Sequence, residues 1–421
     1  MATSGPPGWA RALSRDGWLL FVTFGLRTFA YGFLSVILGP SLAARGFSPA
    51  AIGGIFTASL VGGAVMTIVL TAVADRVGRR RVQLAGALLM AGAGVVFAET
   101  DQWLLLVAAA VLGTISPSGK DVGPFLAVEQ AMLPNTTTDE HRTSVFAWYN
   151  LVGSLAGAVG ALAVGVPPLA GLTPLQSYRA LLWAYAGAAL ILLGLFGSLS
   201  SRVEAGRDTG RDRLRGVGVR RSRGVVARLA ALFALDAFAG GFVLQGLVAY
   251  WFSLRYGVDT GTLAGIFFGT NVLAALSFLA AAPLAKRIGL LNTMVFTHLP
   301  SNVLLVLVPL MPTLPLAVAM LLARHLLSQL DVPTRQSYTM AVVDPDERAA
   351  AAGVLAVARN MAAALAPGIA GSMLAVPALG LPFLAAGGLK IVYDIVILVL
   401  FRRVRPPEET QPPAPALAMN P

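Results

Sequence analysis

Twelve long apolar stretches, separated by short connections, constrain this chain of 421 residues more than any other feature. A bilayer core of about 30 Å requires roughly 20 mostly apolar residues per helix. The stretches that meet this requirement cover residues 18–40, 51–74, 83–99, 103–132, 144–165, 178–200, 227–254, 261–285, 292–311, 315–342, 350–374 and 382–401. The expected fold class is therefore an all-α polytopic membrane protein with twelve transmembrane helices.

The composition excludes several other classes of protein. Charged residues make up 12% of the chain, about half of the roughly 25% that is usual in soluble domains. Cysteine is absent, which excludes disulfides, thiolate metal sites and cysteine nucleophiles. The sequence contains neither a Gly-x-x-x-x-Gly-Lys-Ser/Thr loop nor a His-Glu-x-x-His pair. We therefore expect a protein that is not an enzyme and that uses no ATP, metal or other cofactor.

The basic residues indicate how the chain is oriented in the bilayer. With the amino terminus in the cytosol, the cytosolic segments hold 22 Lys and Arg, and the opposite segments hold three. Because basic segments stay on the cytosolic side, we predict a multi-pass protein of the plasma or inner membrane with both termini cytosolic. The net charge of +11 records this asymmetry, so nucleic acid is not an expected partner. The Pro-rich residues 406–421 are expected to form a disordered cytosolic tail.

The chain is internally duplicated. Four matches occur in order at offsets of 209 to 211: Leu26–Phe33 with Leu235–Phe242, Ala74–Gly78 with Ala285–Gly289, Asp121 with Asp331, and Asn150 with Asn360. Chance can supply any one of these matches, but four in order indicate homology. We therefore expect two homologous six-helix halves, 1–200 and 227–405, joined by a basic cytosolic linker at 201–226.

Residues 75–81, Asp-Arg-Val-Gly-Arg-Arg-Arg, resemble the signature loop of the major facilitator superfamily. With twelve spans, a duplicated chain and a basic linker, the resemblance covers essentially the whole sequence. It implies two pseudo-symmetric six-helix bundles around a central cavity lined by helices one, four, seven and ten. The chain departs from the family pattern at Thr71, where the loop usually begins with Gly, and at Lys286 in the second copy of the loop. Ala158 replaces the proline that family antiporters often carry, so an antiport pattern is only partly present.

The signature loop is expected to act as a cytosolic gate. Asp75 ends a helix and can pair with an arginine or cap a helix of the other half, while Gly78 allows a tight turn. The alternative is a basic loop with an incidental aspartate. The residues assigned to this gate are Asp75, Arg76, Gly78, Arg79, Arg80, Glu129, Arg142, Arg335, Arg348 and Arg359.

Charged residues inside the apolar stretches are the main candidates for function, because a charge at mid-bilayer costs about 2.5–3.5 kcal/mol. They are Arg27, Lys120, Asp121, Glu129, Asp236, Arg324, Asp331, Arg335, Arg359, Lys390 and Asp394. Eight of these eleven lie on helices one, four, seven and ten. The expected substrate and proton cavity comprises Arg27, Tyr31, Lys120, Asp121, Asp236, Gln245, Arg324, His325 and Asp331.

Repeat symmetry suggests partners for some of these charges. Arg27 and Asp236 occupy equivalent positions, so we hypothesise an ion pair across the cavity that opens on transport; the alternative is a static pair. Asp121 and Asp331 each precede a proline, which predicts a kinked, charged gating helix in each half or a purely structural pairing.

Two further groups of polar residues lie on the tenth and twelfth helices. His325 is either a proton relay or substrate contact, or a packing residue. Lys390 and Asp394 are four residues apart on the peripheral twelfth helix, and they are expected to neutralise each other in a structural role.

The expected function is secondary active transport of a small molecule by alternating access. Proton-coupled efflux is favoured because aromatic residues are expected to line an apolar cavity: Phe29, Tyr31, Phe238, Phe242, Tyr250 and Trp251. Uptake of a small organic anion is the first alternative, since Arg27, Lys120 and Arg324 offer positive charge. A sensor or lipid-handling protein without transport is the second. The expected partners are the lipid bilayer, the substrate and protons, and the chain is expected to be a monomer.

Overall fold

A computed structural model describes most of the chain. The described residues are 10, 12–120, 123, 125–138, 141–204, 220–344 and 346–402. Most of the expected linker and the whole of the expected disordered tail lie outside these residues, as does Asp121.

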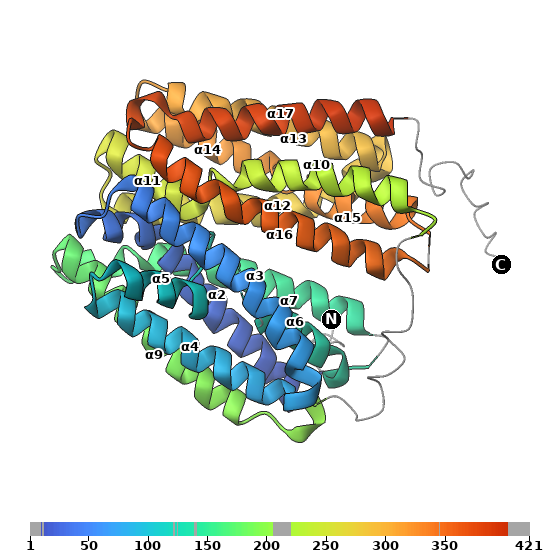
Figure 1. The fold of residues 1–421 in the computed structure, drawn as a ribbon, viewed down its shortest axis with the longest axis horizontal. Coiled ribbons are helices and arrows are strands. Elements are labelled where there is room, and N and C mark those ends of the chain that lie inside the picture. The colour runs from blue at the N-terminus through green and yellow to red at the C-terminus, as the bar shows by residue number, and fades with distance from the viewer. Residues whose placement is uncertain are drawn as a thin grey trace, which may run out of the picture.

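The first bundle consists of helices that lie together in Figure 1. They are α2 (Arg15–Ala44), α3 (Pro49–Val77), α4 (Arg79–Glu99), α5 (Trp103–Leu112), α6 (Phe125–Met132), α7 (Arg142–Ala163), α8 (Val166–Leu169) and α9 (Pro174–Gly197). Two short 3-10 turns follow α6 and α9, at Leu133–Thr136 and Ser201–Val203.

The second bundle contains the remaining helices. They are α10 (Arg223–Gly241), α11 (Gln245–Tyr256), α12 (Thr260–Ile288), α13 (Leu290–Leu307), α14 (Leu314–Leu327), α15 (Asp331–Val342), α16 (Arg348–Met373) and α17 (Leu381–Phe401). Its 3-10 turns are Val308–Leu310 and Pro377–Leu379.

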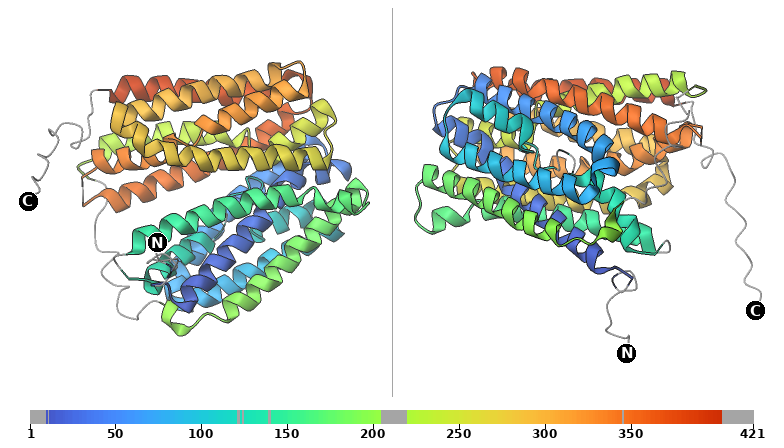
Figure 2. Two further views of the ribbon diagram at one scale, coloured as in Figure 1. Left: turned by 180° about the vertical axis from the view of Figure 1, so that it is seen from behind. Right: turned by 60° about the horizontal axis from the view of Figure 1, so that its bottom comes forward.

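The two bundles meet along three helix pairs. Helix α3 packs against α16, α2 against α11, and α7 against α12. The bundles converge at one end and diverge toward the end where α2 begins and α17 finishes, as both Figure 1 and the reverse view in Figure 2 show. We call the divergent end the linker end, because residues 200–204 and 220–222 lie there, and the other the far end.

Glycine permits the closest of these contacts. A Cβ added to Gly53 of α3 would lie 2.9 Å from the Cα of Gly371 on α16, and one added to Gly371 would lie 2.8 Å from the Cα of Gly53. Small residues allow helices in a membrane to approach each other closely. The far end is therefore closed by direct backbone packing between the bundles.

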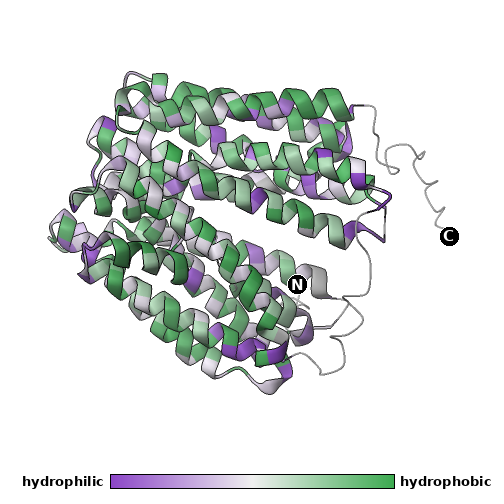
Figure 3. Ribbon diagram, viewed as in Figure 1, coloured by the Kyte–Doolittle hydropathy of each residue, from purple (hydrophilic) through white to green (hydrophobic). Residues whose placement is uncertain are grey.

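Ten helices in the described part of the chain are long and apolar enough to cross a membrane, judged by length and composition. They coincide with ten of the twelve predicted stretches. The remaining two, the fourth and the tenth, are each divided into a pair of shorter helices, α5 with α6 and α14 with α15. Large hydrophobic residues such as Leu104 and Leu169 are exposed, and Figure 3 shows hydrophobic residues along most of each bundle. These features confirm an all-α, multi-pass membrane protein.

The break in the tenth stretch corrects the expectation of a proline-kinked helix. Helix α14 ends at Leu327 and α15 begins at Asp331, so Pro333 lies in the first turn of a new helix. Proline is tolerated there because the first N–H groups of a helix have no acceptor within it. Pro124, its counterpart in the first bundle, lies outside the described residues.

Repeat symmetry also extends to a pair of tight turns. Gly78 separates α3 from α4 with φ of +109°, and Gly289 separates α12 from α13 with φ of +86°. These glycines are 211 residues apart and belong to the two copies of the signature loop. Because L-residues with a side chain rarely adopt such angles, both copies require glycine.

Candidate functional site

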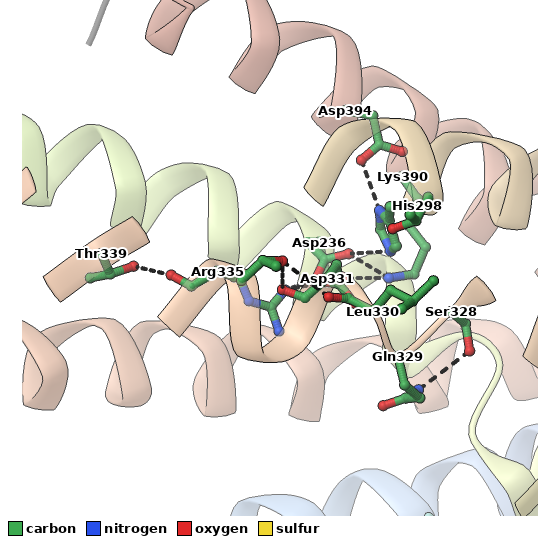
Figure 4. A network of polar contacts seen from close by, with 12 residues as sticks. Asp236, His298, Ser328, Gln329, Leu330, Asp331, Arg335, Thr339, Lys390 and Asp394 are labelled. Carbon is green, nitrogen blue, oxygen red and sulfur yellow. Dashed lines mark hydrogen bonds and ion pairs between the residues drawn. The ribbon is translucent and has the colours of Figure 1, made fainter. Parts of the chain in front are cut away.

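A network of buried charged side chains lies within the second bundle (Figure 4). The Asp236 carboxylate of α10 accepts hydrogen bonds from Arg335 of α15 at 3.0 Å and from Lys390 of α17 at 2.5 Å. Arg335 also forms an ion pair of 3.1 Å with Asp331, one turn earlier on α15. All four side chains are buried. Three helices thus meet around Asp236, which is neutralised inside its own bundle.

His298 of α13 extends this network to a third carboxylate. Its Nδ1 lies 2.8 Å from Oδ1 of Asp394, and its Nε2 lies 3.8 Å from Oδ1 of Asp236. Asn302 donates a hydrogen bond of 2.9 Å to Oδ2 of Asp394. Sequence reasoning missed His298. The available signal was a polar pair, His298 and Asn302, spaced one helical turn apart within an apolar stretch.

A second buried ion pair lies in the first bundle. Arg27 of α2 binds Glu129 of α6 through two hydrogen bonds of 2.7 and 2.6 Å, and both side chains are fully buried. The Tyr149 hydroxyl of α7 donates a further hydrogen bond to Glu129. The Arg27 guanidinium also lies 4.6 Å from the centre of the Phe125 ring. This geometry joins α2, α6 and α7.

These networks correct two expected ion pairs. The hypothesised pair between Arg27 and Asp236 is wrong for this conformation, because each residue has its partner within its own bundle. Glu129 and Arg335, which were assigned to the cytosolic gate, are each buried in an ion pair within their own bundle. The pairing of Lys390 with Asp394 is also wrong: Lys390 binds Asp236, while Asp394 binds His298.

Three cations have a different environment. Lys120 is exposed, although its segment lies between the bundles, and Arg324 and Arg359 are half-buried. Among the side chains that the structure describes, none places a carboxylate within ion-pair distance of these three cations. The Nε atom of Arg324 is buried without a hydrogen-bond partner. Lys120 of the first bundle faces charged residues of the second, among them Arg359, Arg335 and Asp331.

The break between α5 and α6 carries Lys120 and is held by side-chain hydrogen bonds. Carbonyl groups in an unwound membrane segment need such partners, because no water is present in the bilayer core. The Tyr185 hydroxyl donates to the carbonyl of Thr114 at 3.2 Å, and Ser59 donates to the carbonyl of Ile115. The carbonyl of Pro117 accepts from the backbone N–H of Gly246 in the other bundle at 2.9 Å.

Gln245, predicted as a cavity residue, lies beside this break. Its side chain donates a hydrogen bond of 2.9 Å to Ser35 of α2, which joins the two bundles. His325 of α14 lies beside Arg324, and its Nδ1 is 2.7 Å from the carbonyl of Leu321 in its own helix. Tyr31 is fully buried within the first bundle near Tyr185, so it does not line a space between the halves.

The expected aromatic lining is wrong for four of its six residues. Tyr31, Phe242, Tyr250 and Trp251 are buried among packed helices, while Phe29 and Phe238 are half-buried. Their rings pack within the bundles, as in the edge-to-face contact of Trp251 with Phe252. The expectation of an apolar cavity, which favoured efflux of a small molecule, therefore loses most of its basis.

The signature loop is held by a carboxylate that the sequence did not single out. Glu204, after α9, accepts the backbone N–H groups of Arg79 and Arg80 at 2.6 and 3.2 Å. A carboxylate at the start of a helix is favoured because the first N–H groups are free and the helix dipole is positive there. The side chains of Arg79 and Arg80 donate to the carbonyls of Ala131 and Gly197.

Of the remaining gate residues, those whose side chains the structure describes are three arginines. Arg76 is exposed at the end of α3, and Arg348 is exposed at the start of α16. Arg359 lies near Lys120 rather than at the loop. The side chains of Asp75 and Arg142 lie outside the description, so the proposed latch on Asp75 stays a prediction.

The fold and the interior charges define a multi-pass membrane protein with the architecture of a transporter. Residues 20–329 match the Major Facilitator Superfamily model, and the chain belongs to this family. It is 26% identical over 426 residues to the uncharacterized membrane protein YJR124C of Saccharomyces cerevisiae. This alignment covers 93% of this chain and 95% of the yeast protein.

Two solved transporters share the fold. A mutant of the nucleoside transporter NupG has a TM-score of 0.74 at 14% identity and covers 92% of this chain and 100% of its own. The human organic anion transporter MFSD10 (TETRAN) has a TM-score of 0.62 at 17% identity and covers 93% of this chain and 100% of its own.

Proposed function

We propose that the protein is a secondary active transporter that carries a small organic anion by alternating access. The observation that carries this proposal is the unequal pairing of the interior charges. Glu129, Asp236 and Asp331 each have a cationic partner, whereas Lys120, Arg324 and Arg359 have no carboxylate partner among the described residues. Asp121 can neutralise at most one of these three, so positive charge remains for a ligand.

The helix breaks support a binding site at this position. Discontinuous membrane helices commonly place backbone groups and charges around a substrate near the middle of the bilayer. Besides the interruption of the seventh stretch at residues 242–244, two breaks lie in the fourth and tenth stretches, which are equivalent in the two halves. Lys120 lies in the first break, and Arg324 lies one turn before the second. Each of these two breaks therefore has a cation in it or within one turn of it.

The described contacts support an anion more than efflux through an apolar cavity. The aromatic residues that suggested an apolar cavity are mostly buried in helix packing. MFSD10, which shares the fold, is itself an organic anion transporter, although the likeness at 17% identity extends only to the fold. A coupled carrier moves its substrate in the direction set by the gradients of the substrate and the coupling ion together. The same protein can therefore perform either uptake or efflux of the anion.

Ligand-induced stabilisation tests the substrate class. Purified protein is heated with benzoate, succinate or glycerol 3-phosphate, each beside its neutral analogue benzamide, succinamide or glycerol. A ligand at 100 times its Kd stabilises a protein by about 2.7 kcal/mol. We expect at least one anion to raise Tm, and Arg324→Gln and Lys120→Gln to remove that rise. The matched control Arg287→Gln removes an exposed arginine at the end of α12 and should keep it.

Flux then separates a transporter from a sensor. The anion that raises Tm is labelled and offered to proteoliposomes with an imposed pH gradient. Accumulation above protein-free liposomes supports transport, whereas stabilisation without flux supports a sensor. Equal stabilisation by anions and neutral analogues, unaffected by Arg324→Gln, would overturn the anion proposal.

A further inference from the structure

The buried network of the second bundle contains one more acid than permanent base. Its carboxylates are Asp236, Asp331 and Asp394, and its permanent cations are Arg335 and Lys390. With a neutral His298, the members joined by these ion pairs and hydrogen bonds carry a net charge of −1; Arg324 and Arg359, which form no ion pair with them, interact electrostatically with Asp236 and Asp331 from outside this set. An uncompensated charge in a low-dielectric interior is costly, and one additional proton removes it.

The geometry assigns that proton to the hydrogen bond between His298 and Asp394. The two ring nitrogens of His298 face two different carboxylates, Asp394 at 2.8 Å and Asp236 at 3.8 Å. A neutral imidazole can donate through only one nitrogen, whereas an imidazolium donates through both. The Asn302 amide lies 2.9 Å from Oδ2 of Asp394 and 3.1 Å from Nδ1 of His298, so it contacts both members of this pair.

We propose that His298 and Asp394 form the proton-binding site of this transporter, with the proton carried on His298 while Asp394 is ionised. This site lies on α13 and α17, which correspond to the ninth and twelfth predicted stretches, outside the four helices expected to line the cavity. The site itself needs no substrate, but its role in coupling rests on the proposed anion transport.

The charged and titratable groups around the network of His298, Asp236 and Asp394 lie on five helices. They are Asp236 on α10, Arg324 on α14, Asp331 and Arg335 on α15, Arg359 on α16, and Lys390, Tyr393 and Asp394 on α17. Tyr393 packs edge-on against the His298 ring at 5.9 Å. Arg324 and Arg359 form no ion pair within the described network; they belong to the set of cations offered to the anion.

Charge balance indicates the sense of coupling. When the proton leaves His298, the network gains a negative charge beside the cations that would hold the anion. Because this charge repels an anion and attracts the same cations, deprotonation should weaken anion binding. By reciprocity, a bound anion should strengthen proton binding by the same factor. The proton and the anion should therefore bind together, which is the requirement for symport rather than antiport.

Histidine NMR tests the proton site without a substrate. The chain has three histidines, so the variant H141Q/H325Q retains His298 alone. With ¹⁵N-labelled histidine, we expect an imidazolium signal at neutral pH, which Asp394→Asn should convert to a neutral imidazole. The matched control Asp101→Asn removes an exposed carboxylate paired with Arg45 and should leave the signal unchanged. If the double variant does not fold, the wild-type signal is assigned by its loss in His298→Gln.

A neutral His298 in the parent, or an imidazolium that survives Asp394→Asn, would overturn the proton site. Coupling is tested by the Tm rise that benzoate, or another anion active in the stabilisation assay, produces at acidic and alkaline pH. We expect a larger rise at acidic pH in the parent and an equal rise at both in Asp394→Asn. If the Tm rise depends on pH in the same way in both proteins, coupling is overturned but the anion proposal is not. If no anion raises Tm, the proposed function is overturned, while the NMR test of the proton site is unaffected.

Discussion

At the scale of single residues, breaking the ion pair of Arg27 with Glu129 should cause the largest loss of stability. Both side chains are fully buried, and two hydrogen bonds join them. Removing one partner of a buried pair leaves an unpaired charge and costs about 3–5 kcal/mol. We expect Glu129→Gln to lower the free energy of unfolding by that amount, measured by thermal or denaturant unfolding in detergent.

An exposed pair supplies the control for this prediction. Arg179 and Glu99 are 3.9 Å apart, with side chains 61% and 49% exposed. Exposed pairs contribute about 0–1 kcal/mol, so Glu99→Gln should change stability little. Equal losses in the two variants would mean that burial does not set the cost, and the role assigned to Arg27 and Glu129 would have to be abandoned.

The sequence predicts which charged residues are buried, but it does not predict their ion-pair partners. Hydropathy identified Arg27, Asp236, Lys390 and Asp394, because a charge within an apolar stretch stands out in the sequence. Their pairing depends on helix rotation and side-chain reach. Repeat symmetry placed Arg27 opposite Asp236, yet a closer acid on α6 satisfies the arginine. His298 escaped notice since a lone imidazole carries no obligatory charge.

At the scale of the helix, the close packing of the end of α5 against α4 depends on the absence of a side chain at Gly113. A Cβ added to Gly113 would lie 2.1 Å from the Cβ of Ala93 on α4. Overpacking of this kind typically costs about 1–3 kcal/mol, so Gly113→Ala should lower stability by that amount. Gly92, within α4, has open space around it, and alanine is favoured over glycine within a helix by about 0.5–1 kcal/mol. Thermal unfolding should therefore move in opposite directions for Gly113→Ala and Gly92→Ala.

The chain segment before α10 is anchored by Glu347. Its carboxylate accepts the backbone N–H groups of Ser222, Arg220 and Arg221 at 2.9, 2.7 and 2.8 Å. These hydrogen bonds, that of Ser222 foremost, lower the pKa of Glu347 from 4.5 to about 2. The anchor therefore stabilises the fold above the ordinary pKa and is lost as the pH falls toward the lowered value.

This anchor gives a prediction about pH. Thermal unfolding of the parent between neutral pH and about pH 3 should include a loss of stability that Glu347→Gln lacks, because glutamine has no charge to lose. Asp346→Asn, which alters the adjacent ion pair of Asp346 with Arg221, serves as the matched control. Identical pH profiles for the parent and Glu347→Gln would show that the anchor does not contribute.

Helix positions followed from hydropathy, whereas helix breaks did not. An apolar stretch long enough to span the bilayer has the same mean hydropathy whether its backbone is continuous or interrupted. Gly113, Pro117 and Gly119 marked the first break in the sequence, but the second passes through Ser328, Gln329 and Leu330, which carry no such signal. Tertiary contacts from neighbouring helices decide where these backbone groups find partners.

At the scale of the whole molecule, closure at the far end should control transport. The chain has no cysteine, so an introduced pair can be cross-linked without interference. A Cβ added to Gly165, after α7, would lie 3.6 Å from the Cβ of Ala264 on α12. This separation falls within the range of about 3.5–4.5 Å for disulfides. Oxidation of Gly165→Cys with Ala264→Cys should therefore join the two bundles.

A carrier that alternates access must open the far end after closing the linker end. We expect the oxidised double variant to lose flux of the labelled anion in proteoliposomes and to regain it on reduction. Each single cysteine variant controls for the substitution, and a gel shift after cleavage between the halves reports cross-linking. If the cross-link forms completely and flux persists, the bundles do not need to separate between α7 and α12, and rocking about the far end is the wrong description of this protein.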